Sequence, residues 1–164
     1  MAKRKAKARK TSTSLLTGGC QCGAVRYAIP VPTKGVHLCH CRMCQKAVGN
    51  YFAALAPAPR DQLIWTRGAP TWFRSSTAAE RGFCKVCGTP LTFAYVGGKT
   101  IHISIGSLDN PDAVTLDVQY GVEARRPAFD SFAALPAKPT DSASLNKHYP
   151  SYTSFQHPDH DTTS

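Results

Sequence analysis

The sequence lacks a long apolar run and lacks a sustained helical pattern of apolar residues. Its longest nearly apolar stretch, residues 51–59, contains prolines and is far shorter than the ~20 residues of a membrane-spanning helix. The basic start is followed by Thr and Ser and only a Leu15-Leu16 pair, so we expect no secretory signal. These absences predict a soluble, cytoplasmic protein with no membrane partner, in a compartment that keeps thiols reduced.

Acidic residues are also scarce, because the 164-residue chain has 10 Asp and Glu against 20 Lys and Arg. Six of the basic residues lie in residues 1–10, so the remainder of the chain carries a formal charge of only +4. A lysine-rich tail can contact nucleic acid, but short charged termini are commonly solvated and disordered. We therefore expect residues 1–14 to form a basic disordered tail and nucleic acid to bind only through it.

One domain with a modest core is expected over residues 15–136. Residues 137–164 are rich in Pro, Ser, Thr, Asp and His and have no sustained period, which predicts a polar, weakly structured C-terminal tail. The spacing of its histidines, His148, His157 and His160, matches no zinc motif.

Strands are predicted where apolar residues alternate with a period of two. The segments are Val25-Tyr27-Ile29, Ile101-Ile103-Ile105, Trp72-Phe73 and Leu91–Val96. The Gly97-Gly98 pair between two of these segments indicates a hairpin. A helical turn is plausible only around Cys41–Ala47, where Cys41 and Cys44 would share a face. The pattern predicts a mainly β domain of small antiparallel sheets.

Cysteine is abundant, and its seven residues fall into three groups. These are Cys20-Gln21-Cys22, Cys39-His40-Cys41-Arg42-Met43-Cys44 and Cys84-Lys85-Val86-Cys87. Four thiolates complete a tetrahedral zinc site, whereas three leave one position open for chemistry. The first and third groups together would make a closed site, and the second group would make an open one. Without a secretory signal, metal ligation is a better interpretation than disulfides, so we expect two zinc ions per chain.

The local geometry expected of the closed site has three parts. Gly88 tolerates a left-handed backbone after Cys84 and Cys87. Cys20 and Cys22 would point to one face of an extended strand. A shared zinc ion would then clip together segments 61 residues apart. Buried structural thiols are the alternative.

Other interpretations exist for the second group. His40 could be a fourth ligand, although on an extended segment it would point away from Cys39 and Cys41. His37 is a weaker candidate ligand. A redox trio is a third possibility, but a thioredoxin-like strand–helix context is absent. Arg42 and Lys46 lie where they could offset the negative charge of a zinc tris-thiolate or attract an anionic substrate.

Four segments extend the pattern beyond the cysteines and resemble the family of glutathione-dependent formaldehyde-activating enzymes, which includes centromere protein V. The segments are Thr17–Tyr27, Cys39–Lys46, Arg74–Ser76 followed by Arg81–Leu91, and Ile105–Asp109, within a resemblance that covers residues 17–136. The resemblance implies small antiparallel sheets stapled by zinc, a β-tent. It also implies structural ligands Cys20, Cys22, Cys84 and Cys87 and catalytic ligands Cys39, Cys41 and Cys44. The family's named reaction adds glutathione to formaldehyde and, in reverse, is that of a carbon–sulfur lyase.

Two departures from the family lie in residues 118–129. Family members often carry a histidine after the Ser-Leu-Asp segment, where this chain has Gln119-Tyr120. They also carry a Pro-Trp further on, and Phe129 stands near the tryptophan position. Since every zinc-ligand position is retained, we expect the departures to affect the substrate more than the metal.

The leading hypothesis is that a zinc-activated thiol, glutathione or a similar molecule, adds to formaldehyde or a related aldehyde. Arg26, Arg42 and Lys46 are the candidate contacts for the carboxylates of glutathione as co-substrate.

Two alternatives belong to other classes. One is a non-enzymatic zinc protein that binds glutathione or thiol adducts, which the missing histidine favours. The other is a nucleic-acid or chromatin-associated module, in which Trp65, Trp72 and Phe73 would stack on bases. The strand periodicity of these aromatics is explained more simply by core or sheet-face positions.

Overall fold

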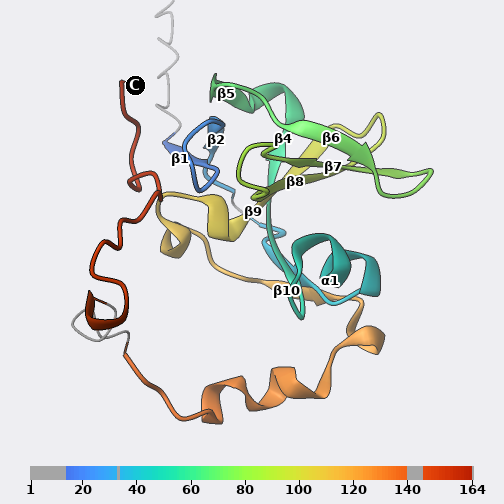
Figure 1. The fold of residues 1–164 in the computed structure, drawn as a ribbon. Helices are drawn as coiled ribbons and strands as arrows, with labels where there is room; N and C mark the ends of the chain where they lie inside the picture. The colour runs from blue at the N-terminus through green and yellow to red at the C-terminus, as the bar shows by residue number, and fades with distance from the viewer. Residues whose placement is uncertain (1–13, 33, 140–145, 164) are drawn as a thin grey trace, which may run out of the picture.

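Two β-sheets organise the chain. The computed structural model describes residues 14–32, 34–139 and 146–163, and the basic tail expected over residues 1–14 lies outside them except for Ser14. One sheet has three strands and the other has seven (Figure 1). Within the described ranges, no helix is long and apolar enough to cross a membrane.

The three-stranded sheet has the order β1-β2-β5 and is antiparallel throughout. Its strands are β1 (Leu15–Gly19), β2 (Arg26–Pro30) and β5 (Ile64–Arg67). A bulge between Arg26 and Tyr27 shifts the register against β5. Because β2 is central, Arg26, Tyr27, Ala28 and Ile29 are all buried, so the period-two pattern there does not separate a buried face from an exposed one.

The seven-stranded sheet has the order β10-β3-β4-β9-β8-β7-β6. In that order its strands are β10 (Val118–Tyr120), β3 (His37–Cys39), β4 (Ala53–Pro59), β9 (Thr100–Ser104), β8 (Pro90–Tyr95), β7 (Ala79–Phe83) and β6 (Thr71–Arg74). Every pair is antiparallel except β10 with β3, which is parallel. The mainly β prediction is confirmed, with one parallel edge added to the antiparallel sheets.

Helical structure is short. The α-helix α1 (Arg42–Val48) is capped by Cys41, whose Sγ accepts a hydrogen bond from the Cys44 amide, and it ends at Gly49 with a left-handed φ of 63°. The 3₁₀ segments are η1 (Arg60–Gln62), η2 (Ile105–Ser107), η3 (Pro111–Ala113), η4 (Val122–Ala124) and η5 (Pro127–Ala134). The helical turn expected around Cys41–Ala47 is therefore confirmed as α1.

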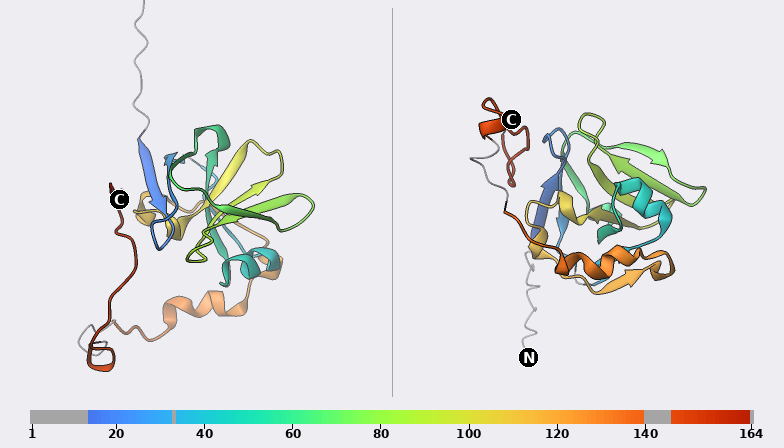
Figure 2. Two further views of the ribbon diagram at one scale, coloured as in Figure 1. Left: turned by 45° about the horizontal axis from the view of Figure 1, so that its top comes forward. Right: turned by 60° about the horizontal axis from the view of Figure 1, so that its bottom comes forward.

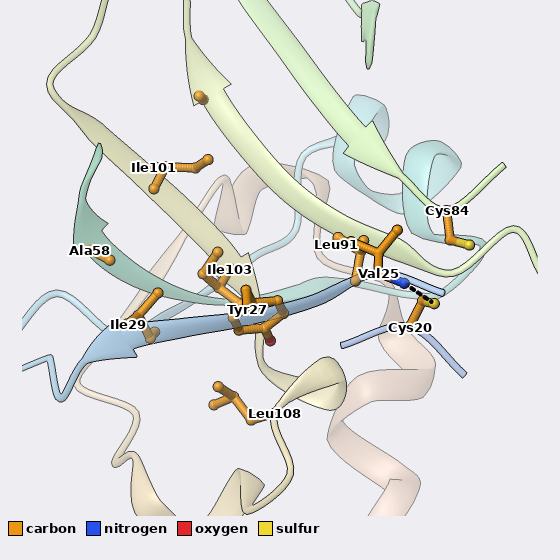
Figure 3. Close-up of a cluster of buried hydrophobic side chains, with 11 residues drawn as sticks. Cys20, Val25, Tyr27, Ile29, Ala58, Cys84, Leu91, Ile101, Ile103 and Leu108 are labelled. Carbon is orange, nitrogen blue, oxygen red and sulfur yellow. Dashed lines mark hydrogen bonds between the residues drawn. The ribbon is translucent and has the colours of Figure 1, made fainter. Parts of the chain in front are cut away.

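The core joins the two sheets (Figure 3). Tyr27 and Ile29 from β2 pack with Leu91 of β8 and with Ile101 and Ile103 of β9, and all five side chains are almost fully buried. Cys20 and Cys84 belong to the same apolar cluster, so two candidate metal ligands lie at the junction of the sheets.

Most strand predictions are confirmed, and two local expectations are wrong. Leu91–Val96 corresponds to β8, and Gly97 has a φ of 69° in the hairpin to β9. Ile105 does not continue β9 but begins η2, because the chain turns there and the Leu108 amide donates to the Ile105 carbonyl. Cys20 and Cys22 lie in a turn rather than on an extended strand, since the Gly23 amide donates to the Cys20 carbonyl at 3.0 Å.

The C-terminal segment returns to the first sheet (Figure 2). The His157 amide donates to the Gln21 carbonyl at 2.7 Å, and Asp161 pairs with Arg26 at 2.7 Å. Arg67 of β5 donates to the Thr162 carbonyl. Residues 157–162 therefore lie against the turn that carries Cys20 and Cys22.

The hydrogen bond between Tyr27 and Ser107 supplies a stability test. The Tyr27 hydroxyl is buried and lies 2.7 Å from Ser107 Oγ, which also donates to the Ser104 carbonyl. Tyr27→Phe should lower the free energy of unfolding by about 1 kcal/mol, because one buried hydrogen bond is lost while Ser107 keeps its other partner. Urea unfolding at saturating zinc measures the change. Tyr95→Phe is the control, since Tyr95 is 60% exposed, and an equal loss in both variants would contradict the assignment.

Candidate metal centres

The four-thiol group consists of Cys20, Cys22, Cys84 and Cys87, whose sulfur atoms all lie within 4.8 Å of one another. The Sγ atoms of Cys20 and Cys22 are 3.6 Å apart, and those of Cys22 and Cys84 are 3.9 Å apart. A tetrahedron with zinc–sulfur distances of about 2.3 Å has edges of roughly 3.8 Å. All four cysteines are free thiols, so their spacing and chemistry fit zinc.

Two turns position these four sulfurs. The first follows β1, where the Val25 amide donates to Cys20 Sγ at 3.2 Å (Figure 3). In the same turn Gly23 has a φ of 74°. The second follows β7, where the Gly88 amide donates to the Cys84 carbonyl at 2.8 Å. Gly88 has the expected left-handed φ, at 78°. Each turn presents two sulfurs, and the packing of the two sheets brings the turns together.

The thiols of this group differ in proton affinity. Burial raises the pKa of Cys20 to about 12 although the Val25 amide opposes the shift. Burial also acts to raise the pKa of Cys87, but hydrogen bonds from Thr89 and the Cys22 segment outweigh it and lower that pKa to about 6. Crowded thiols that share protons in this way can release them to a cation.

The three-thiol group consists of Cys39, Cys41 and Cys44, whose sulfur atoms also lie within 4.8 Å of one another. Cys39 ends β3, Cys41 caps α1, and Cys44 lies in the first turn of that helix. The Cys44 amide donates to Cys41 Sγ at 3.4 Å, so the cap itself fixes two of the three sulfurs. One strand end and one helix start therefore build the whole group from six consecutive residues.

The β10–η4 connection closes one side of the three-thiol group. The His40 amide donates to the Tyr120 carbonyl at 2.9 Å, and a Cβ at Gly121 would lie only 2.8 Å from the Cys41 nitrogen. Gly121 also has a left-handed φ of 65°. Only glycine allows the backbone to approach Cys41 this closely, which explains how α1 and β10 come to be neighbours (Figure 1).

Neither candidate histidine joins the three sulfurs within the described part of the chain. His40 is fully buried between Phe52 and Phe129, and its Nε2 lies 2.8 Å from Gln119 Oε1. Gln119 stands where the resemblance implies a histidine, and its side-chain amide therefore points toward His40. His37 Nδ1 donates to the Gly35 carbonyl at 2.8 Å.

Arg81 is a candidate functional residue that sequence reasoning missed. Its side chain from β7 is buried, its Nη2 donates to Cys44 Sγ at 3.3 Å, and its guanidinium lies 4.9 Å from the centre of the Phe93 ring. The Cys39 thiol, helped by Arg81, lowers the pKa of Cys44 to about 5, although burial opposes the shift. The same thiol–thiol hydrogen bond, together with burial, raises the pKa of Cys39. The sequence signal that could have indicated Arg81 was its position within a strand, three residues before the turn that begins at Cys84.

The basic residues expected near the three-thiol group have different surroundings. Arg42 and Lys46 are exposed on α1, and Arg42 donates to Gln45 Oε1 at 3.1 Å. No contact between a sulfur atom and either side chain is observed in the described residues, so Arg81 is better placed to offset thiolate charge.

The expected glutathione contact of Arg26 is not supported by its placement. Arg26 is only 2% exposed, and its two terminal nitrogens donate to Asp109 at 2.8 and 2.6 Å. Its Nη2 also donates to Asp161 at 2.7 Å. A guanidinium already paired with two carboxylates has little capacity left for a ligand, so Arg26 ties the first sheet to the C-terminal segment.

Two cavities flank α1. The basic cavity, of about 510 Å³, is lined by Arg42, Gln45, Lys46, Gly49, Asn50, Tyr51 and Arg126. The apolar cavity, of about 350 Å³, is lined by Ala47, Val48, Leu55, Phe73, Arg81, Gly82, Phe83, Gly88, Pro90, Thr92, Phe93 and Ser104. A larger cavity of about 970 Å³ lies at the other end of β4. Among the described residues, no cysteine lines any of these three cavities.

Three comparisons with known proteins, by family profile, by sequence and by structure, each find similar proteins. Residues 15–123 match the sequence profile of a family described as glutathione-dependent formaldehyde-activating enzyme. An uncharacterized lyase of Schizosaccharomyces pombe is 28% identical over 114 residues, which cover 69% of this chain and 82% of the relative. The crystal structure of a Rhodobacter sphaeroides protein aligns with a TM-score of 0.51 at 25% identity, over 63% of this chain and 98% of that one.

The two thiol groups should respond differently to loss of one ligand. Cys41→Ser should remove one zinc equivalent and leave the fold largely intact, because its ligands come from one short segment. Cys84→Ser should remove the other equivalent and unfold much of the protein, because its group joins the two sheets. Native mass spectrometry counts the metal, and thermal unfolding reports the fold. Global unfolding of Cys41→Ser would contradict this division.

Arg81 should control metal retention in the three-thiol group. Arg81→Gln should weaken zinc binding there by about 10- to 100-fold, as is typical when a partner of a metal ligand is removed. Arg74→Gln is a matched control, because Arg74 is exposed on the neighbouring strand and, among the described residues, donates to the Thr77 carbonyl alone. Chelator competition followed by native mass spectrometry measures each site separately. Equal zinc retention in the two variants would show that Arg81 has no such role.

Proposed function

The chain belongs to the family of glutathione-dependent formaldehyde-activating enzymes, and from this premise we propose that it is a zinc-dependent carbon–sulfur lyase. In the synthetic direction the sulfur of glutathione, or a similar thiol, forms a bond with the carbonyl carbon of formaldehyde or a related aldehyde. The thiol proton passes to the former carbonyl oxygen, and the lyase direction reverses both changes. The observation that carries the proposal is that the chain has a group of three free thiols in addition to, and separate from, a complete group of four.

Two zinc ions per chain are part of this proposal. Cys20, Cys22, Cys84 and Cys87 would hold a closed structural ion, and Cys39, Cys41 and Cys44 would hold an ion with a free position. Support comes from the sulfur-only donor sets and their spacing within 4.8 Å. When bound at the three-thiol group, zinc supplies a Lewis acid that lowers the pKa of a substrate thiol at the free position.

The residues around the three-thiol group would compensate the negative charge of its thiolates. Three thiolates with one divalent cation leave a net negative charge, which buried Arg81 offsets from the Cys44 side. The backbone at Gly121 lies close against Cys41 on its other side. Because both groups belong to packed elements, little reorganisation is needed when charge develops on the substrate.

The basic cavity would bind the carboxylates of glutathione. Arg42, Lys46 and Arg126 contribute three positive charges to it, and glutathione carries two carboxylates. The cavity lies on the helix that carries Cys44, so its ligand would be held close to the three-thiol group. Arg126 thus replaces Arg26 in the set of contacts expected from the sequence.

A non-enzymatic carrier of glutathione or its adducts is the second candidate. It is favoured by Gln119, because an amide at the position where the family often has histidine cannot transfer a proton. The nucleic-acid alternative gains no support from the aromatic residues. Trp65 packs edge-on against Tyr27, and Trp72 and Phe73 point to opposite faces of β6, so the three form no common stacking surface.

Exchange kinetics distinguish these candidates. Zinc-loaded protein should accelerate exchange between ¹³C-formaldehyde, glutathione and their adduct, measured by exchange NMR, and Cys41→Ser should abolish the acceleration. Lys46→Glu should raise KM by about tenfold with little change in kcat, because a charge-assisted contact worth about 1.5 kcal/mol is lost. Lys99→Glu is the control, since Lys99 is exposed and lines a different cavity. Saturable glutathione binding without acceleration would establish the carrier instead.

A further inference from the structure

We propose that the preferred substrate is the thiol adduct of an aldehyde with an apolar chain or ring, and that this organic group occupies the apolar cavity beside Cys44. The inference rests on the proposed function and specifies its aldehyde. Formaldehyde has no organic group, so a site built for it alone has no use for an apolar cavity of about 350 Å³.

The apolar cavity lies on the face of the seven-stranded sheet that points away from the core. Phe73, Arg81 and Phe93 stand opposite one another across β6, β7 and β8. Phe83 lies two residues after Arg81 on β7 and so shares its face, and its ring centre lies 6.0 Å from that of Phe73. Three aromatic rings therefore line one side of the cavity.

The cavity begins next to the three-thiol group. Leu55 and Cys44 belong to one buried cluster, against which Val48 and Phe93 pack. Arg81 joins the two features directly, because its Nη2 contacts Cys44 Sγ at 3.3 Å while its guanidinium lies over Phe93. If the sulfur of the adduct lies at the three-thiol group, only the Arg81 side chain would separate its organic group from the apolar cavity.

The thiol partner itself does not suit this cavity. Glutathione carries two carboxylates and an ammonium group, and burying them among Leu55, Phe73 and Phe93 would cost several kcal/mol without compensating hydrogen bonds. The two carboxylates match the basic cavity on the other side of α1. An apolar group has the opposite preference and gains free energy from leaving water. The basic cavity would thus bind the charged part of the adduct, and the apolar cavity would bind its organic group.

Of three buried side-chain nitrogens without a hydrogen-bond partner in the described residues, one belongs to a residue that lines the apolar cavity. Arg81 Nε is buried and has no hydrogen-bond partner among the described residues. An N–H donor in this state suits an oxygen of the adduct, because a buried donor without a partner is costly. The same residue would then contact the Cys44 sulfur, the Phe93 ring and the substrate.

Non-reactive adduct analogues test the inference. Binding of S-methyl-, S-butyl- and S-hexylglutathione to the zinc-loaded full chain is measured by calorimetry. Each buried methylene should tighten binding by about threefold to fourfold. Phe73→Ala should flatten this dependence on chain length. Trp72→Ala is the matched control, because Trp72 is the adjacent residue of β6, is similarly exposed at 37% against 44%, and does not line the cavity.

The outcomes separate this inference from the proposed function. Rising affinity with chain length, lost in Phe73→Ala and kept in Trp72→Ala, together with faster exchange of 3-methylbutanal than of formaldehyde, supports both. Affinity that is independent of chain length, with formaldehyde exchange intact, overturns the inference and leaves the proposed function standing. Absence of glutathione binding and of exchange with every aldehyde overturns both.

Discussion

The structure depends on one constraint, the convergence of four sulfurs at the junction of two sheets. Cys20 and Cys22 follow β1 of the small sheet, whereas Cys84 and Cys87 follow β7 of the large one. The apolar cluster around Tyr27 also joins the sheets, and Gly18 of β1 forms an isolated bridge with Leu108, which follows η2. Four crowded thiols without a cation must keep their protons or repel one another, so a metal ion there would convert a costly contact into the strongest link between the sheets.

The alternation of side chains along the large sheet produces both the core and the candidate site. On β8 and β9, Ala94 and Ile101 face the core, while Phe93 and His102 face the other way. Arg81 shares that second face and reaches Cys44 on α1. Once the four sulfurs and the core fix the sheet, its outer face becomes a rigid support for the three-thiol group. Structural and chemical roles are thus separated by a single period-two pattern.

The sequence predicted the features that depend on local pattern. The cysteine groups, the β8–β9 hairpin at Gly97 and the helical turn at Cys41 are each encoded within a few residues. Features that depend on distant partners were missed. Arg26 was assigned to a ligand because Asp109 and Asp161, its actual partners, lie 83 and 135 residues away. Arg81 was overlooked because only the packing of α1 on the sheet brings it to Cys44, and the parallel pairing of β10 with β3 is equally non-local.

The three thiols and the residues that border them belong to different elements, so the surroundings can change without loss of the thiols. The three thiols belong to residues 39–44, held by the end of β3 and the start of α1. The side chain at Gln119 is on β10, and the aromatic wall of the apolar cavity is on β6, β7 and β8. Substitutions on those strands alter what borders the thiols but leave their own backbone in place. Under the proposed function, substitutions of Phe73, Phe83 or Phe93 would therefore change which organic group is bound, while thiol activation would stay with the separate elements that carry the three thiols.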